Sequence, residues 1–179
     1  MERVLVSEHI TSGAWADRPL EGSLAIEGRA MLVALARDLS VDPGVEIVTT
    51  WDARLGPFPV DTVEVEVVES VAAADEAFRR LAGDSDRTLV IAPEVDGLLE
   101  QRSKQVDAAG GRWIGCRRSA IAICSDKLAT ADHLQRHGIA VVDTRTADQP
   151  RPDSDFVVWK PRDGAGSMEI RVRPADQSP

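Results

Sequence analysis

The sequence predicts an open α/β fold, in which a parallel sheet of Rossmann-like type is followed by a smaller α+β unit. Three observations carry this prediction. Short apolar runs typical of strands alternate with stretches of helical periodicity along residues 1–118. The run TLVIA at 88–92 is apolar throughout and ends before Pro93, as expected for a central parallel strand covered on both faces. After Cys116 the pattern changes to a helix and short strands.

The expected elements of residues 1–118 alternate as they do in a parallel sheet. Strands are expected at 4–6, 45–49, 63–67, 88–92 and 113–114. Helices are expected at 24–39, 70–81 and 96–108. At 63–67 the valines alternate with Glu64 and Glu66, which is the period of a half-buried edge strand. The glycines 110–111 end the third helix.

Residues 119–179 are expected to form the second unit. Ser125 can cap a helix that runs to about Arg136, and the His-Gly pair at 137–138 can end it. Strands are expected at 139–144, 156–160 and 169–173. The last two strands frame the segment WKPRDGAGSMEI, residues 159–170, so its glycines join one strand to another.

Composition and charge exclude several classes of protein. The formal charge is −9 and the 21 basic residues are scattered, which argues against nucleic acid as a partner. No apolar run approaches the roughly 20 residues that span a bilayer, and no signal peptide is visible, so we expect a cytoplasmic protein without a membrane partner. Cys116 and Cys124 lack zinc-like ligand spacing and are expected to be two partly buried thiols.

The glycine-rich loop GAGS, residues 164–167, raises the question of a phosphate site. It is not a Walker loop, because no Gly-Lys-Ser/Thr precedes a helix. It is not a dinucleotide fingerprint either, because Glu169 stands where the last glycine belongs and a strand follows. A glycine-rich loop between strands can still cover phosphates with its backbone N–H groups. A plain turn is the alternative interpretation.

Two lysines favour the phosphate interpretation. Lys160 ends the apolar strand FVVWK four residues before the loop, where a charge is costly unless it faces solvent or an anion. Lys127 lies in the first turn of the expected helix, where a cation is mildly unfavourable unless an anion is bound nearby. A solvated helix lysine is the alternative for Lys127.

Two segments in this order resemble the nucleotide-binding part of ATP-grasp carboxylate–amine ligases. They are SDKLATADHLQRHGIAVVDT and FVVWKPRDGAGSMEIRV, which correspond to a DK-containing helix and a V-x-KP-x-x-G-x-GS flap. The segments EHITSGAW, SLAIEGRAMLVALARDL, IAPEVDGLL and GCRRSAIAICSDK are similar to one branch of that family. This branch is related to the archaeal tyramine–glutamate ligase of methanofuran biosynthesis and has relatives in bacterial one-carbon metabolism. The resemblance covers nearly the whole chain.

The resemblance implies an ATP-dependent ligase that joins small-molecule carboxylate and amine substrates into an amide through an acylphosphate. It implies nucleotide contacts for Lys127 and Lys160. It implies a flap over the phosphates for Gly164, Ala165, Gly166 and Ser167. Residues 1–118 would be a pre-ATP-grasp substrate domain, and the loops after its strands supply the substrate candidates Glu8, Ser12, Gly13, Glu94 and Asp96. Loop polar groups and helix caps are the alternative for these residues.

The sequence departs from the family after the flap. There the family has its adenine-binding linker and its Mg²⁺ ligands, whereas this sequence ends at Pro179, and Asp163 and Glu169 are the acids near the flap. We therefore expect the Mg²⁺ ligands to lie outside this chain and the chain alone to be catalytically silent. A noncatalytic ligand-binding or interaction module on the same scaffold is the alternative. The edge strand at 63–68 makes a homodimer possible.

Overall fold

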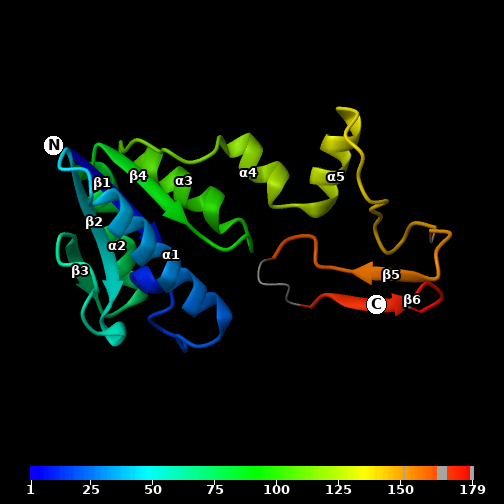
Figure 1. Cartoon of the computed structure of the whole chain (residues 1–179), viewed down its shortest axis with the longest axis horizontal. Coiled ribbons are helices and arrows are strands. Elements are labelled where there is room, and N and C mark those ends of the chain that lie inside the picture. Colours follow the sequence, from blue (N-terminus) through cyan, green and yellow to red (C-terminus); the bar gives the residue numbers. More distant parts are fainter. Residues whose placement is uncertain (151, 165–168, 178–179) are drawn as a thin grey trace. The chain divides into compact units, whose positions relative to one another are not determined.

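The computed structural model describes residues 1–150, 152–164 and 169–177 (Figure 1). The chain divides into two compact units. Unit 1 comprises Met1–Pro93 and Leu98–Cys116, and unit 2 comprises Glu94–Gly97 and Arg117–Pro179. A four-stranded parallel sheet in unit 1 and a small antiparallel hairpin in unit 2 confirm the predicted α/β fold class.

The sheet of unit 1 has the strand order β3-β2-β1-β4. Its strands are β1 (Glu2–Glu8), β2 (Val45–Asp52), β3 (Glu64–Val68) and β4 (Arg87–Ile91). The helices are α1 (Ser23–Leu39), α2 (Val71–Asp84) and α3 (Leu98–Ala108), with the short elements η1 (Ile10–Ala14) and η2 (Ala53–Leu55) after β1 and β2. Strand–helix alternation therefore produces the parallel sheet that the sequence predicts.

Alternation along β1 builds a core on each face of the sheet. Val4 packs in one cluster with Leu32 of α1. Leu5 packs in a second cluster with Phe78 of α2 and Val106 of α3. Successive side chains of a strand point to opposite faces, so α1 covers one face and α2 with α3 covers the other.

The expected edge strand is confirmed and an expected central strand is not. β3 ends the strand order and pairs with β2, and its Glu64 forms an ion pair of 2.7 Å with Arg3. Charged side chains on an edge discourage pairing with another chain, so a homodimer through β3 stays a prediction. β4 was expected to be central but lies at the opposite edge. An apolar strand sequence indicates that both faces of the strand are covered. It does not indicate whether the strand is central or at an edge.

The expected strand at 113–114 is reduced to a single β-bridge. Trp113 forms this bridge with Thr88 of β4. The Ile114 N–H donates to the Thr88 carbonyl at 3.1 Å, and the Thr88 N–H donates to the Arg112 carbonyl at 2.8 Å. The segment therefore covers part of the β4 edge without extending the sheet.

The described residues of unit 2 form two helices and the hairpin (Figure 1). They are α4 (Arg118–Cys124), α5 (Lys127–Arg136), β5 (Phe156–Trp159) and β6 (Arg171–Pro174). α4 was not predicted, because a seven-residue helix is too short to show a clear period. The prediction of a strand at 139–144 is wrong. These residues have no strand partner in the described parts of the chain, and Val142 is 85% exposed.

Two smaller expectations about unit 2 also need correction. The N-cap of α5 is Asp126, whose carboxylate accepts the N–H groups of Leu128 and Ala129, whereas the Ser125 hydroxyl donates to the Ala122 carbonyl. The two cysteines are exposed and not partly buried.

The buried core lies almost entirely in unit 1. Among the described residues of unit 2, Ile121 is the one fully buried hydrophobic side chain, and Phe156 and Val172 of the hairpin are 62% and 64% exposed. Most hydrophobic stabilisation of the described structure therefore comes from unit 1. None of the helices in the described residues has the length and apolar character needed to cross a membrane.

Candidate functional site

A cavity in unit 2 brings the two predicted nucleotide lysines together. Its volume is about 1130 Å³, and both Lys127 and Lys160 line it. The remaining walls come from residues between 142 and 150, from β5 and from the start of β6. A cavity of this size can hold a small-molecule ligand.

Lys127 faces the segment that leads into the glycine-rich loop. Its Nζ lies 3.4 Å from the carbonyl oxygens of both Arg162 and Gly164, and its backbone N–H donates to the Arg162 carbonyl at 2.9 Å. Both ammonium contacts are long for hydrogen bonds. An ammonium group has three N–H donors, so Lys127 retains the capacity to bind an anion.

Asp126 secures this arrangement from the N-terminus of α5. Its carboxylate accepts the N–H groups of Leu128 and Ala129 at 2.9 and 3.1 Å and pairs with the Arg162 guanidinium. The hydrogen bond from Arg162, followed by those two N–H groups, lowers the pKa of Asp126 below its ordinary value. The N-terminus of α5 is therefore occupied by its own cap, and a phosphate would be bound by the lysines and not by this helix end.

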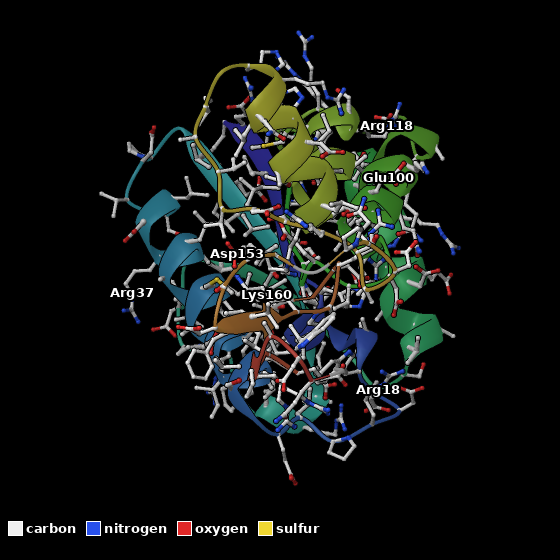
Figure 2. The ribbon with its side chains drawn as sticks, turned by 90° about the vertical axis from the view of Figure 1, so that its right-hand side faces the viewer. Arg18, Arg37, Glu100, Arg118, Asp153 and Lys160 are labelled. Atoms are coloured by element: carbon white, nitrogen blue, oxygen red, sulfur yellow. The ribbon has the colours of Figure 1, made fainter. Side chains whose placement is uncertain are left out.

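Lys160 follows β5 and is exposed (Figure 2). Arg145 and Arg162 of the cavity wall are paired with carboxylates, whereas Lys160 and Arg171 form no ion pair with a described residue. Together with Lys127 they provide positive charge that is not neutralised by described neighbours. Such a surplus favours a polyphosphate ligand.

The flap can be described only at its first residue. Gly164 has a φ of +120°, a conformation that glycine adopts most readily, and its N–H donates to the Glu94 carbonyl at 2.5 Å. Ala165, Gly166 and Ser167 lie outside the described residues. Their assignment to the phosphates stays a prediction.

The substrate candidates of the first loop lie together at the carboxyl end of β1. Glu8 is 1% exposed, and its carboxylate accepts hydrogen bonds from the Ile10 N–H at 3.1 Å, the Thr11 N–H at 2.8 Å and the Thr11 hydroxyl at 2.7 Å. Ser12 accepts the Glu8 N–H, and Gly13 has a φ of +97°. Burial raises the pKa of Glu8, partly offset by these hydrogen bonds. The carboxylate therefore holds the η1 turn in place. This geometry favours the alternative interpretation of Glu8 as a loop polar group over a substrate contact.

His9 is a residue of this region that the sequence interpretation missed. It is 9% exposed, and its Nδ1 has no hydrogen-bond partner among the described residues. Burial, followed by the charges of Arg102 and Arg18, lowers the pKa of His9 to about 4, so its imidazole is neutral near pH 7. β2 and β4 lie on opposite sides of β1, so the strand order reverses at β1. Open α/β sheets bind ligands at the carboxyl end of the strands where the order reverses. The position of His9 directly after the first expected strand is the sequence signal that could have identified it.

The substrate candidates after β4 lie in unit 2. Glu94 and Asp96 are exposed, and their backbones contact Asp163 and Gly164. The Glu94 carbonyl accepts the Gly164 N–H, and the Asp96 N–H donates to the Asp163 carboxylate at 3.1 Å. The structure thus joins them to the nucleotide candidates of unit 2.

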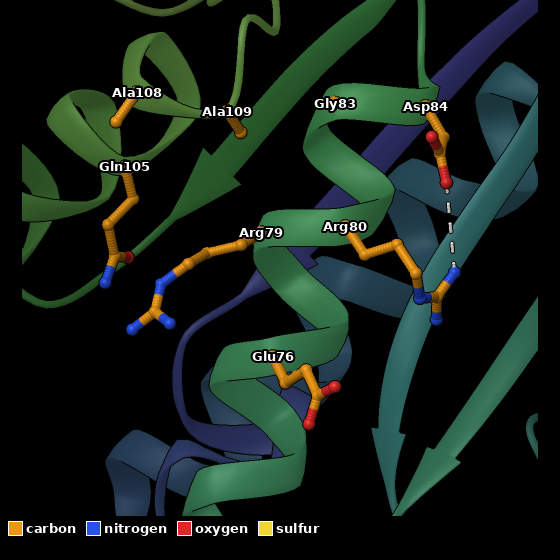
Figure 3. A pocket seen from close by; sticks show the side chains of 8 residues that line it. All are labelled: Glu76, Arg79, Arg80, Gly83, Asp84, Gln105, Ala108 and Ala109. Atoms are coloured by element: carbon orange, nitrogen blue, oxygen red, sulfur yellow. Dashed lines mark ion pairs between the residues drawn. The ribbon is translucent and has the colours of Figure 1, made fainter.

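A second hollow, of about 560 Å³, lies between α2 and α3 of unit 1 (Figure 3). Its arginines have carboxylate partners: Arg79 pairs with Asp75, and Arg80 pairs with Glu66 and lies 4.0 Å from Asp84. We assign no function to this hollow, because its arginines already have carboxylate partners. Across the described ranges no three His, Cys, Asp or Glu side chains are grouped so that they could hold a metal ion.

Comparison with known proteins finds a similarity to a pre-ATP-grasp domain model and to a solved structure. Residues 45–121 match the model of the pre ATP-grasp 3 domain, a segment that runs from β2 into α4. The structure is similar to a crystal structure described as a "putative ATP-grasp superfamily protein from Archaeoglobus fulgidus", with a TM-score of 0.67 and 24% sequence identity. The match covers 92% of this chain and 48% of that chain, so this chain spans about half the length of the solved structure. No curated protein matches the sequence significantly.

These matches show a likeness of one segment and of the fold. The segment 45–121 is similar to a pre-ATP-grasp domain, and the chain shares its fold with a protein described as belonging to the ATP-grasp superfamily. They do not specify a reaction, a substrate or a pathway.

Proposed function

We propose that this chain provides the acceptor-substrate domain and the first part of the nucleotide site of an ATP-dependent carboxylate–amine ligase. The observation that carries the proposal is the cavity in unit 2 that both Lys127 and Lys160 line. The contact of Lys127 Nζ with the Gly164 carbonyl supports it, because it joins this lysine to the start of the glycine-rich loop. The match of residues 45–121 to a pre-ATP-grasp domain supports the same class.

The residues of the cavity fit the demands of a polyphosphate. Lys127, Lys160 and Arg171 supply positive charge on the cavity wall, which can neutralise phosphate oxygens. ATP, when bound, supplies the phosphoryl group that activates a substrate carboxylate toward attack by an amine. In such reactions the protein contributes mainly positioning and charge neutralisation.

The described residues do not fit the Mg²⁺ that accompanies ATP in this family. No suitable group of three ligands occurs in the ranges 1–150, 152–164 and 169–177. The Asp163 carboxylate already accepts a backbone N–H, and Glu169 is a single exposed acid. The proposed site therefore takes its positive charge from lysine and arginine side chains.

The substrates in this proposal are a small carboxylate and a small amine. The carboxyl end of the parallel sheet is the expected acceptor site, because open α/β sheets bind ligands there. A role in methanofuran-like cofactor biosynthesis and one-carbon metabolism rests on sequence resemblance alone.

Ligand-induced stabilisation tests the nucleotide site. At 100 times its dissociation constant, ATP should add about 2.7 kcal/mol to the free energy of unfolding, and NAD should add none. The chain has three lysines, which allows a matched set: Lys127→Ala and Lys160→Ala should weaken the ATP effect, whereas Lys104→Ala on α3 should not. The proposal is wrong if the wild-type chain shows no preference for ATP, or if both cavity variants bind it normally.

A noncatalytic binding module is the second candidate function. We expect chain 1–179 to release no ADP when supplied with ATP, Mg²⁺, carboxylates and amines. ADP release that depends on both substrates would refute this expectation and exclude the module.

A further inference from the structure

The segment 162–164, which leads into the glycine-rich loop, is hydrogen-bonded on two sides within unit 2. On one side, the Lys127 N–H donates to the Arg162 carbonyl at 2.9 Å, and Lys127 Nζ lies 3.4 Å from the Gly164 carbonyl. On the other side, the Gly164 N–H donates to the Glu94 carbonyl at 2.5 Å. The position of Gly164 relative to Lys127 therefore depends on the turn at 94–97 as well as on α5.

The turn at 94–97 has an unusual backbone. Asp96 and Gly97 both have positive φ, of 50° and 66°. A positive φ is uncommon for a residue other than glycine and persists when surrounding contacts hold it in place. One such contact is the hydrogen bond of 3.1 Å from the Asp96 N–H to the Asp163 carboxylate.

We propose that Asp163 is a positioning residue of the nucleotide site. By accepting the Asp96 N–H, its carboxylate holds the turn at 94–97 against Gly164. This contact sets the position of Gly164, where the glycine-rich loop begins, relative to Lys127. The inference rests on the proposed function. Asp163 acts here as a hydrogen-bond acceptor and has no direct role toward the phosphates. Its side chain is exposed, so its replacement does not disturb the buried core.

A role as a metal ligand is the competing explanation for an acid at this position. The two roles make opposite demands on the side chain. Asparagine keeps a carbonyl oxygen that can accept the Asp96 N–H, but it lacks the negative charge that a hard cation requires. Alanine lacks both. The pair Asp163→Asn and Asp163→Ala therefore separates hydrogen-bond acceptance from charge.

The experiment uses chain 1–179 and a matched control, Asp153→Ala, in the exposed loop before β5 (Figure 2). The first measurement is amide hydrogen exchange at Asp96 and Gly164 without nucleotide, resolved by NMR. Exchange should accelerate about fivefold in Asp163→Ala, as expected for the loss of about one net hydrogen bond, and should be unchanged in Asp163→Asn and in the control. The second measurement is the dissociation constant for ATP without Mg²⁺, which should rise about fivefold in Asp163→Ala alone.

Each outcome has a defined meaning. Unchanged exchange in Asp163→Ala would show that the contact does not hold the turn, and normal ATP affinity in that variant would show that it does not position the nucleotide site. Equal losses in the asparagine and alanine variants would favour a role for the charge and overturn the inference. If the exchange results are as expected but the wild-type chain binds no ATP, the proposed function fails and the positioning role with it, while the hydrogen bond between Asp163 and the turn is established.

Discussion

Replacing Glu8 with alanine tests whether this buried carboxylate holds the η1 turn. The side chain is 1% exposed and accepts two backbone N–H groups and one hydroxyl. The Thr11 hydroxyl can rotate toward another acceptor, but the N–H groups of Ile10 and Thr11 cannot. At about 1–3 kcal/mol for each buried donor left without an acceptor, Glu8→Ala should cost about 2–6 kcal/mol. Domains are typically stable by about 5–15 kcal/mol, so this is a large loss.

Urea unfolding followed by circular dichroism measures this cost. Glu27→Ala is the control, because Glu27 lies on the exposed face of the same helix that Glu8 faces, and it should change stability by less than about 0.5 kcal/mol. A cost below about 1 kcal/mol for Glu8→Ala, with an unchanged denaturant slope, would refute the structural role. The carboxylate would then be available to a substrate.

The same residue predicts a pH dependence. Burial raises the folded-state pKa of Glu8, so the folded protein binds this proton more tightly than the unfolded chain does. The contribution is fully present below the unfolded pKa and is lost as pH rises through the folded pKa. The stability advantage of the wild type over Glu8→Ala should therefore be larger at pH 4 than at pH 7. An advantage that shrinks on acidification would contradict the direction of the shift.

Three further predictions concern unit 1 and the thiols. Gly28→Ala should destabilise the wild type by about 1–3 kcal/mol, since the new Cβ would lie 2.6 Å from the Glu8 Cδ. The same substitution should be tolerated in the Glu8→Ala background. Equal costs in both backgrounds of a double-mutant cycle would refute the clash. The imidazole of His9 should stay neutral until about pH 4 in an NMR titration; protonation near its ordinary pKa of 6.5 would show that it is not buried. Both Cys116 and Cys124 should react with a thiol reagent in the native protein, and protection of either would contradict its exposure.

Much of the fold could be predicted because it depends on local periodicity. Side chains that alternate along a strand, or repeat at helical spacing, show a buried face wherever the element packs. The four strands of the sheet and the helices α1, α2 and α3 follow from such patterns, with boundaries that differ by a few residues. The segment 139–144 shows the limit of this reasoning, because an apolar run becomes a strand only where another strand is available to pair with it.

The candidate nucleotide site was predictable in part. The positions of Lys127 and Lys160 relative to a helix start and a glycine-rich loop predict nucleotide contacts, and the structure places both lysines on one cavity. The local sequence shows Asp163 only as an acid near the flap, since nothing in it indicates that this side chain accepts the N–H of a residue 67 positions away. Glu8 is a substrate candidate because it is a polar residue after a strand, and the sequence does not show that its side chain is buried.

By itself, the sequence determined the fold class and the order of the four sheet strands and of α1, α2 and α3, and it predicted two lysines near a glycine-rich loop. Only the tertiary structure decided that β4 is an edge strand, that the Glu8 carboxylate lies against Gly28, and that the turn at 94–97 is bonded to the start of the loop. The physical reason is that periodicity and capping act between neighbouring residues. Strand order, burial of a polar group and hydrogen bonds between distant loops depend on which parts of the chain meet when it folds.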